Sequence, residues 1–190
     1  MLLLDQAEVH KMVQSEKTKK LIKIAQKIIV GLIIGLIIGL VLFVVSVSYY
    51  DNSEKKQLES QIEPLLRKAD SLAESREFEE AINKYEDVLN LITPNNLPVK
   101  YALTQNNLGT AYSDLADVRN KESNLEKAIN AFNETLKIRT VEKYPIDYAE
   151  TQNNLGVAYW GLADVRDKES NLEKSINAYN EALKICTVEK

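Results

Sequence analysis

The sequence predicts an all-α protein in which one N-terminal transmembrane helix precedes a solenoid of about three helical hairpins. Three observations lead to this fold class. Residues 28–50 contain no charged side chain. The stretches 104–143 and 151–190 are nearly the same sequence, set 47 residues apart. Apolar residues within each stretch recur at the spacing of an amphipathic helix. A repeat of this length is a supersecondary unit that buries its apolar face by stacking on its neighbours.

Charge and composition exclude several classes of function. The chain has 190 residues and a formal net charge of −4; the first 50 residues carry +3 and the remainder −7. An acidic main domain argues against nucleic acid as a partner, because phosphate binding needs a basic face. Cys186 is the only cysteine and His10 the only histidine. We therefore expect no intrachain disulfide, no metal site and no cofactor.

Residues 28–50 are predicted to be a transmembrane helix that follows an N-terminal segment, 1–27. Twenty-three helical residues rise about 34 Å, enough for a hydrocarbon core of about 30 Å. Tyr49 and Tyr50 stand at the end of the stretch, where aromatic rings favour the headgroup region. A cleaved signal peptide is the alternative, with small residues at 46–48. The apolar run is longer than a signal peptide usually has, and a long charged segment precedes it, so we expect an uncleaved anchor.

The lysines predict the orientation of this single-pass anchor. Two lysines follow the span closely, Lys55 and Lys56, and five precede it: Lys17, Lys19, Lys20, Lys23 and Lys27. Because positive charge resists translocation, the N-terminus is expected in the cytoplasm. Residues 51–190 are then expected outside the cytoplasmic membrane.

Three glycines in the span suggest a membrane contact. Gly31, Gly35 and Gly39 recur every four residues and form one stripe on a helix. Such a small-xxx-small pattern lets a second helix approach closely, which predicts a homodimer or a membrane partner. Glycine is also common in membrane helices without any contact role.

Residues 51–60 are expected to link the membrane segment to the hairpins. They carry charges and few apolar residues. Pro64 follows shortly afterwards, and proline suits the first turn of a helix rather than its interior. An unbroken helix from the membrane into the first hairpin is therefore not expected.

Each repeat is expected to be two antiparallel helices. One apolar face consists of Leu155, Ala158, Tyr159 and Leu162, and a second of Leu172, Ile176, Tyr179 and Leu183. Pro98 and Pro145 suit the first turns of the opening helices. Capping boxes are predicted before the second helices, at Ser123 with Glu126 and at Ser170 with Glu173.

The strings NLGTAY, AINAF, NLGVAY and SINAY resemble tetratricopeptide repeats. Gly109 and Ala128 take the positions where two helices touch, with bulk supplied by Tyr112 and Phe132. The segment 61–95 fits the 34-residue form, with signature residues at Ala69, Ala81, Tyr85 and Pro94. The units 98–143 and 145–190 carry seven extra residues and are more similar to the long repeats of kinesin light chains. In them Ser175 replaces an alanine, and Gln105 and Gln152 replace an aromatic residue.

The resemblance implies a concave groove that binds a protein or peptide. The two copies differ at eight of forty positions. Three differences fall at i, i+3 and i+4 of the first helix: Thr110/Val157, Ser113/Trp160 and Asp114/Gly161. By the resemblance this stripe lines the groove, so its variation would tune binding. Drift on an exposed surface would produce the same pattern.

Asparagines are the second set of candidate ligand-binding residues, because a side-chain amide both donates to and accepts from a peptide backbone. Asn106 and Asn153 are expected in the groove. Asn107 and Asn154 are also candidates, although the family uses asparagine there to join repeats. Trp160 is the sharpest candidate, since tryptophan is a common hot spot; packing on a neighbouring helix is its alternative role.

The residues do not indicate an enzyme. A lone histidine cannot build a catalytic triad around any of the serines, and Cys186, which replaces Arg139 of the earlier copy, is interpreted as a surface or packing residue. We expect a membrane-anchored scaffold that mediates protein–protein interaction. Two alternatives remain: the front part of a larger regulatory or sensor protein whose effector domain follows, or an assembly factor that acts through its transmembrane helix.

Overall fold

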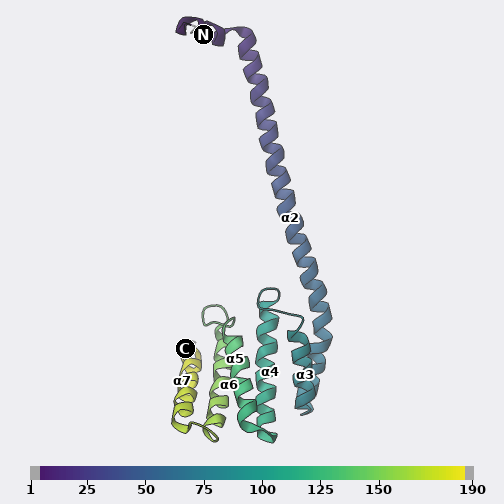
Figure 1. Cartoon of the computed structure of the whole chain (residues 1–190), viewed down its shortest axis with the longest axis vertical. Coiled ribbons are helices and arrows are strands. Elements are labelled where there is room, and N and C mark those ends of the chain that lie inside the picture. Colours follow the sequence, from purple (N-terminus) through teal and green to yellow (C-terminus); the bar gives the residue numbers. More distant parts are fainter. Residues whose placement is uncertain (1–4, 187–190) are drawn as a thin grey trace. The chain divides into compact units, whose positions relative to one another are not determined.

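The computed structural model describes residues 5–186, which form seven α-helices and no strand (Figure 1). The all-α prediction is confirmed. The chain divides after Ser53 into two units, and each is described here by itself. Residues 1–4 of the expected N-terminal segment and residues 187–190 of the expected third repeat lie outside the described part.

The first unit contains α1 (Gln6–Gln14) and the beginning of α2 (Glu16–Glu74). The charge-free stretch 28–50 is helical, and every side chain in it is exposed. Among the described residues, α2 is the one helix that is long and apolar enough to cross a membrane, with a mean hydropathy of 3.4 over its most apolar window. That finding concerns length and composition alone.

Residues 51–60, the predicted linker, are helical and belong to α2, so the expectation that no unbroken helix runs from the charge-free stretch into the first hairpin is wrong. Pro64 also lies inside this helix rather than at its start. Proline removes one backbone hydrogen bond and crowds the carbonyl four residues earlier, a cost of about 3 kcal/mol. Ser60 and Pro64 are both exposed, so water can reach the carbonyl that loses its partner. Ile62 and Leu66 on the opposite side are buried, and their burial offsets part of the cost.

The second unit is a row of three helical hairpins. The end of α2 pairs with α3 (Phe78–Leu89), α4 (Pro98–Val118) with α5 (Lys121–Leu136), and α6 (Pro145–Ala163) with α7 (Lys168–Cys186). From α3 to α7, each helix packs on the next one in sequence, and α4 also contacts α6. The first helices of the last two hairpins therefore lie side by side (Figure 1).

A glycine allows the two helices of each long hairpin to approach closely. A Cβ atom on Gly109 would lie 2.6 Å from Phe132 Cε1, and one on Gly156 would lie 2.9 Å from Tyr179 Cε1. Real Cβ atoms do not approach a ring this closely, so only glycine fits without displacing the ring. The expected contact at Gly109 is thus present, and Phe132 on the opposite helix is buried.

Gly109→Ala is expected to lower the free energy of unfolding by about 1–3 kcal/mol, because overpacking outweighs the better helix propensity of alanine. Thermal unfolding of the detergent-solubilised chain, followed by circular dichroism, measures this. Gly161→Ala is the control: its Cβ would meet only the end of the Leu125 side chain, at 3.2 Å, a looser contact than the one at Gly109. A loss at Gly161 as large as that at Gly109 would contradict the assigned cause.

The predicted capping boxes are wrong, because α5 and α7 begin earlier than expected. Ser123 and Ser170 lie inside the helices. The turns instead use left-handed residues, Asn120 with φ 50° and Asp167 with φ 45°. Buried asparagines one turn into each helix then close the turns: Asn124 Nδ2 donates to the Arg119 carbonyl at 2.9 Å, and Asn171 Nδ2 to the Arg166 carbonyl at 2.7 Å.

Candidate ligand-binding groove

Asn106 is not a groove residue. It is only 4% exposed, and its Oδ1 accepts a hydrogen bond from Thr151 Oγ1 of α6 at 3.2 Å. Thr151 is itself fully buried. The side chain therefore joins the second hairpin to the third and is closed to a ligand.

Asn107 joins the first hairpin to the second. Its Nδ2 donates to Asp70 Oδ1 at 3.2 Å, and the hydroxyl of Tyr85 donates to the same oxygen at 2.6 Å. Burial and the neighbouring Asp70 carboxylate raise the pKa of Tyr85, so its hydroxyl keeps its proton and remains a donor. Asn107 thus joins two repeats, which is the role that the family resemblance implies for an asparagine at this position.

The equivalent asparagines of the last hairpin are more accessible. Asn153, which corresponds to the buried Asn106, is exposed, and Asn154 is half-buried. Asn153 differs from Asn106 because no described helix packs on α6 in the way that α6 packs on α4. Its exposure therefore follows from its place in the last of the described hairpins.

The variable stripe presents one large aromatic side chain. Trp160 is 58% exposed, and Val157, one turn earlier in α6, is exposed as well. On α4, Thr110 is exposed, but its hydroxyl donates to the Asn106 carbonyl of its own helix at 3.2 Å. Ser113 is half-buried, and its hydroxyl oxygen is buried with no partner in the described part of the chain. Among the residues of the stripe, Trp160 thus offers the largest exposed side chain, and it does not pack in the core.

Asp114 and Gly161 of the stripe contact the preceding hairpins. Asp114 borders a cavity of about 210 Å³ together with Arg76, Phe78 and Asp117. Burial, and secondarily the charge of Asp117, raise the pKa of Asp114, while Arg76 acts in the opposite direction. Gly161 faces Leu125 of α5. This third pair thus differs in environment from Val157 and Trp160.

Asp114→Asn is expected to raise the melting temperature at pH 7. The folded state binds a proton at Asp114 more tightly than the unfolded chain does, so the ionised carboxylate destabilises the fold once the pH exceeds its ordinary value of 3.8. The gain should shrink as the pH falls and vanish below that value. Melting curves of the variant and the parent between pH 3 and pH 7 test this; a gain independent of pH would contradict it.

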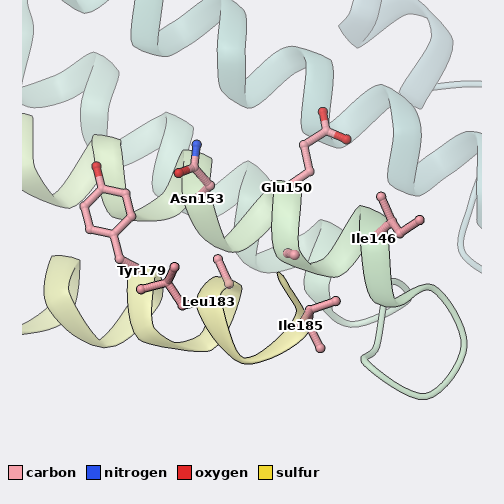
Figure 2. Close-up of a pocket in the computed structure, with 8 residues that line it drawn as sticks. Ile146, Glu150, Asn153, Tyr179, Leu183 and Ile185 are labelled. Atoms are coloured by element: carbon pink, nitrogen blue, oxygen red, sulfur yellow. The ribbon is translucent and has the colours of Figure 1, made fainter. Parts of the chain in front are cut away.

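A larger cavity, of about 610 Å³, opens between α6 and α7 at the end of the row (Figure 2). Its lining is mostly apolar. Figure 2 shows Ile146, Glu150 and Asn153 on α6, with Tyr179, Leu183 and Ile185 on α7; Ala149 and Ala182 complete the lining. Of these, only Asn153 was a candidate from the sequence. Comparison of the two copies could have indicated the cavity. Ala149 lines it and corresponds to Ala102, which is buried in the preceding hairpin.

No group of three or more His, Cys, Asp or Glu side chains that could hold a metal ion occurs among the described residues. His10 lies in α1 and is exposed. The side chain of Cys186 is outside the described part, so its expected role as a surface or packing residue stays a prediction.

Residues 43–185 match a bacterial family described as "Uncharacterized protein conserved in bacteria (DUF2225)". The match covers well over half of the chain. The chain belongs to the DUF2225 family. The DUF2225 region begins inside the apolar stretch of α2 and includes all three hairpins. No curated protein and no solved structure matched the chain.

The glycine stripe precedes the DUF2225 region. Gly31, Gly35 and Gly39 lie in α2, and a Cβ atom added to any of them would meet no other atom within 4 Å. The space beside the stripe is open, as a helix–helix contact would require. The contact itself stays a prediction.

Proposed function

We propose that this DUF2225 protein is a membrane-anchored scaffold whose hairpins are tetratricopeptide repeats that bind a protein or peptide in a concave groove. The repeat signature and the row of paired helices support this assignment. The observation that carries the binding proposal is Trp160. Two repeats that are otherwise nearly identical differ there by a serine and a tryptophan, and the tryptophan is exposed. An exposed tryptophan beside Val157 offers a ligand a large apolar contact.

The proposed anchor is the apolar stretch 28–50. Its side chains are exposed along its whole length, and such a surface is stable in lipid but not in water. We further propose that the N-terminus is cytoplasmic and that the hairpins lie outside the cytoplasmic membrane, because the lysines gather before the span. A homodimer through the glycine stripe is compatible with this arrangement.

Trp160→Ala is expected to weaken ligand binding about 30-fold, since truncating an interface tryptophan removes about 2 kcal/mol or more. The melting temperature should stay within about 2 °C of the parent value, because surface substitutions rarely exceed about 0.5 kcal/mol. The probes are peptides selected from a random dodecapeptide library on the full chain in lipid nanodiscs, with binding measured by fluorescence anisotropy.

Ser113→Ala is the matched control, because it changes the equivalent position of the preceding repeat and leaves Trp160 in place. It should change binding and stability little. A Trp160→Ala variant that melts many degrees lower would show that the ring supports the fold. Unchanged affinity for every selected peptide would remove Trp160 from the proposed groove.

The topology is tested with single-cysteine variants made in a Cys186→Ser background. Ser170→Cys, at an exposed position of α7, should react with a membrane-impermeant maleimide in intact bacterial spheroplasts. His10→Cys, exposed in α1, should react only after the membrane is permeabilised. The reverse labelling pattern would place the hairpins in the cytoplasm, and labelling of both without permeabilisation would exclude a single-pass anchor.

A further inference from the structure

The five lysines before the apolar stretch lie on a helix that begins well ahead of that stretch. Helix α2 starts at Glu16, whereas the charge-free residues are 28–50. Ser15 caps the helix: the Thr18 amide donates to Ser15 Oγ at 3.2 Å, and the Lys19 amide donates to the Ser15 carbonyl at 3.1 Å. The helix therefore fixes the positions of the lysines around its axis.

The lysines occupy one side of this helix. Lys20, Lys23 and Lys27 lie almost above one another at 3.6 residues per turn. Lys17 and Lys19 flank this row, so that the five lysines cover a sector of about 160° around the axis. All five side chains are exposed, and within the described part of the chain none of them pairs with a carboxylate. We name these five residues the lysine face.

Apolar side chains occupy the opposite side. Five residues centre on the direction away from the lysines: Leu21, Ile22, Ala25, Ile28 and Ile29. All of them are exposed. Glu16 and Ile24 are the exceptions, because they lie on the same side as the lysines. The segment 17–29 is thus a basic amphipathic helix that continues directly into the apolar stretch.

The apolar surface of α2 is consequently longer on one side than on the other. On the side of Ala25 it extends over residues 21–50, about 45 Å of helix, and on the lysine side over residues 28–50, about 34 Å. A span longer than a hydrocarbon core of about 30 Å is accommodated by tilting. A tilt that buries the side of Ala25 among acyl chains leaves the lysine face at the level of the headgroups.

We propose that the lysine face binds the headgroups of acidic phospholipids in the leaflet next to the N-terminal segment. The groups recognised are phosphates whose charge is not neutralised within the same headgroup, as in phosphatidylglycerol. Phosphatidylcholine does not qualify, because its choline cancels the charge of its phosphate. The inference rests on the anchor proposed above and adds which lipid lies beside it.

The arrangement of the lysines favours a lipid over a soluble anion or an acidic protein segment. Lys27 is the immediate neighbour of the charge-free stretch, and the apolar side opposite the lysines has no use in binding a soluble anion. Orientation in the membrane depends on how many lysines stand near the span, and it does not require them on one side of a helix. A lipid surface requires both features, because it presents charge and hydrocarbon at adjacent depths.

The first experiment measures which lipid the protein selects. The full chain is reconstituted in phosphatidylcholine vesicles with a trace of spin-labelled phosphatidylglycerol or spin-labelled phosphatidylcholine. Electron paramagnetic resonance then gives the fraction of each lipid that is immobilised at the protein. At low salt the parent should select phosphatidylglycerol about threefold, and in 1 M NaCl the preference should vanish because the screening length falls to about 3 Å. Replacing the five lysines by glutamine should also remove it, and replacing them by arginine should retain it.

A pair of lysines in the hairpins provides the matched control. Lys20→Gln with Lys23→Gln and Lys68→Gln with Lys143→Gln each remove two positive charges, and all four side chains are exposed. Only the first pair should reduce the preference for phosphatidylglycerol.

An exchange of neighbouring residues separates the lysine face from the total charge. Lys20→Leu with Leu21→Lys, combined with Lys23→Ala and Ala25→Lys, keeps the composition and moves two lysines to the apolar side. This variant should keep the orientation of the parent in the maleimide assay but lose about half of the preference or more.

Three results would count against the proposal. Equal association of both lipids with the parent at low salt would overturn it and leave the anchor intact. Full preference in the exchanged variant would show that only the number of lysines matters, and the one-sided lysine face would be wrong. Release of the parent from phosphatidylcholine vesicles by 1 M NaCl, measured by flotation, would contradict the anchor itself and this inference with it.

Discussion

The hairpins of this protein carry apolar residues on the faces that they turn toward neighbouring hairpins. The second unit is therefore stable only when its hairpins stack on one another. Ala81 and Tyr85 of α3 and Leu108 and Ala111 of α4 belong to one buried cluster that runs through successive hairpins. Burying a large aliphatic or aromatic side chain contributes about 1.5–3 kcal/mol, and a hairpin alone leaves in water the side chains that a neighbouring hairpin covers. Stability thus depends on the junctions between hairpins.

Polar contacts at the junctions fix the register in which the hairpins stack. The hydroxyl of Tyr112 in α4 donates to Glu86 of α3 at 2.8 Å, and Lys100 reaches Glu63 at 2.7 Å. Ion pairs between exposed side chains contribute only about 0–1 kcal/mol each. The polar contacts mainly select one stacking register, because a shifted register would separate Asn107 from Asp70 and leave both side chains without their hydrogen-bond partner. The apolar faces supply the energy, and the polar pairs specify one arrangement.

The helical class and the pairing of helices could be predicted because the spacing of apolar residues and the glycines at 109 and 156 are local signals. The predictions at Pro64 and at the start of α5 were wrong because they depend on the surroundings of these residues in the fold. Pro64 is tolerated inside α2 because its side of the helix is exposed, which the sequence does not state. The start of α5 is set by the left-handed Asn120 and by a hydrogen bond from the side chain of Asn124. The sequence pattern at Ser123 fits a capping box equally well, and it therefore predicted the wrong first residue of the helix.

Position in the row explains why site residues were harder to predict than helices. Asn106 and Asn153 have the same neighbours in sequence, yet one is buried against Thr151 and the other lines an open cavity. Ser175 stands where the earlier copy has Ala128, and its hydroxyl donates to the Gly156 carbonyl at 2.8 Å, so the added polar group is satisfied in a buried site. In a linear array each hairpin meets only its neighbours. Exposure at a given repeat position is therefore a property of the neighbour as much as of the residue, and the two nearly identical copies in this chain present different surfaces for that reason.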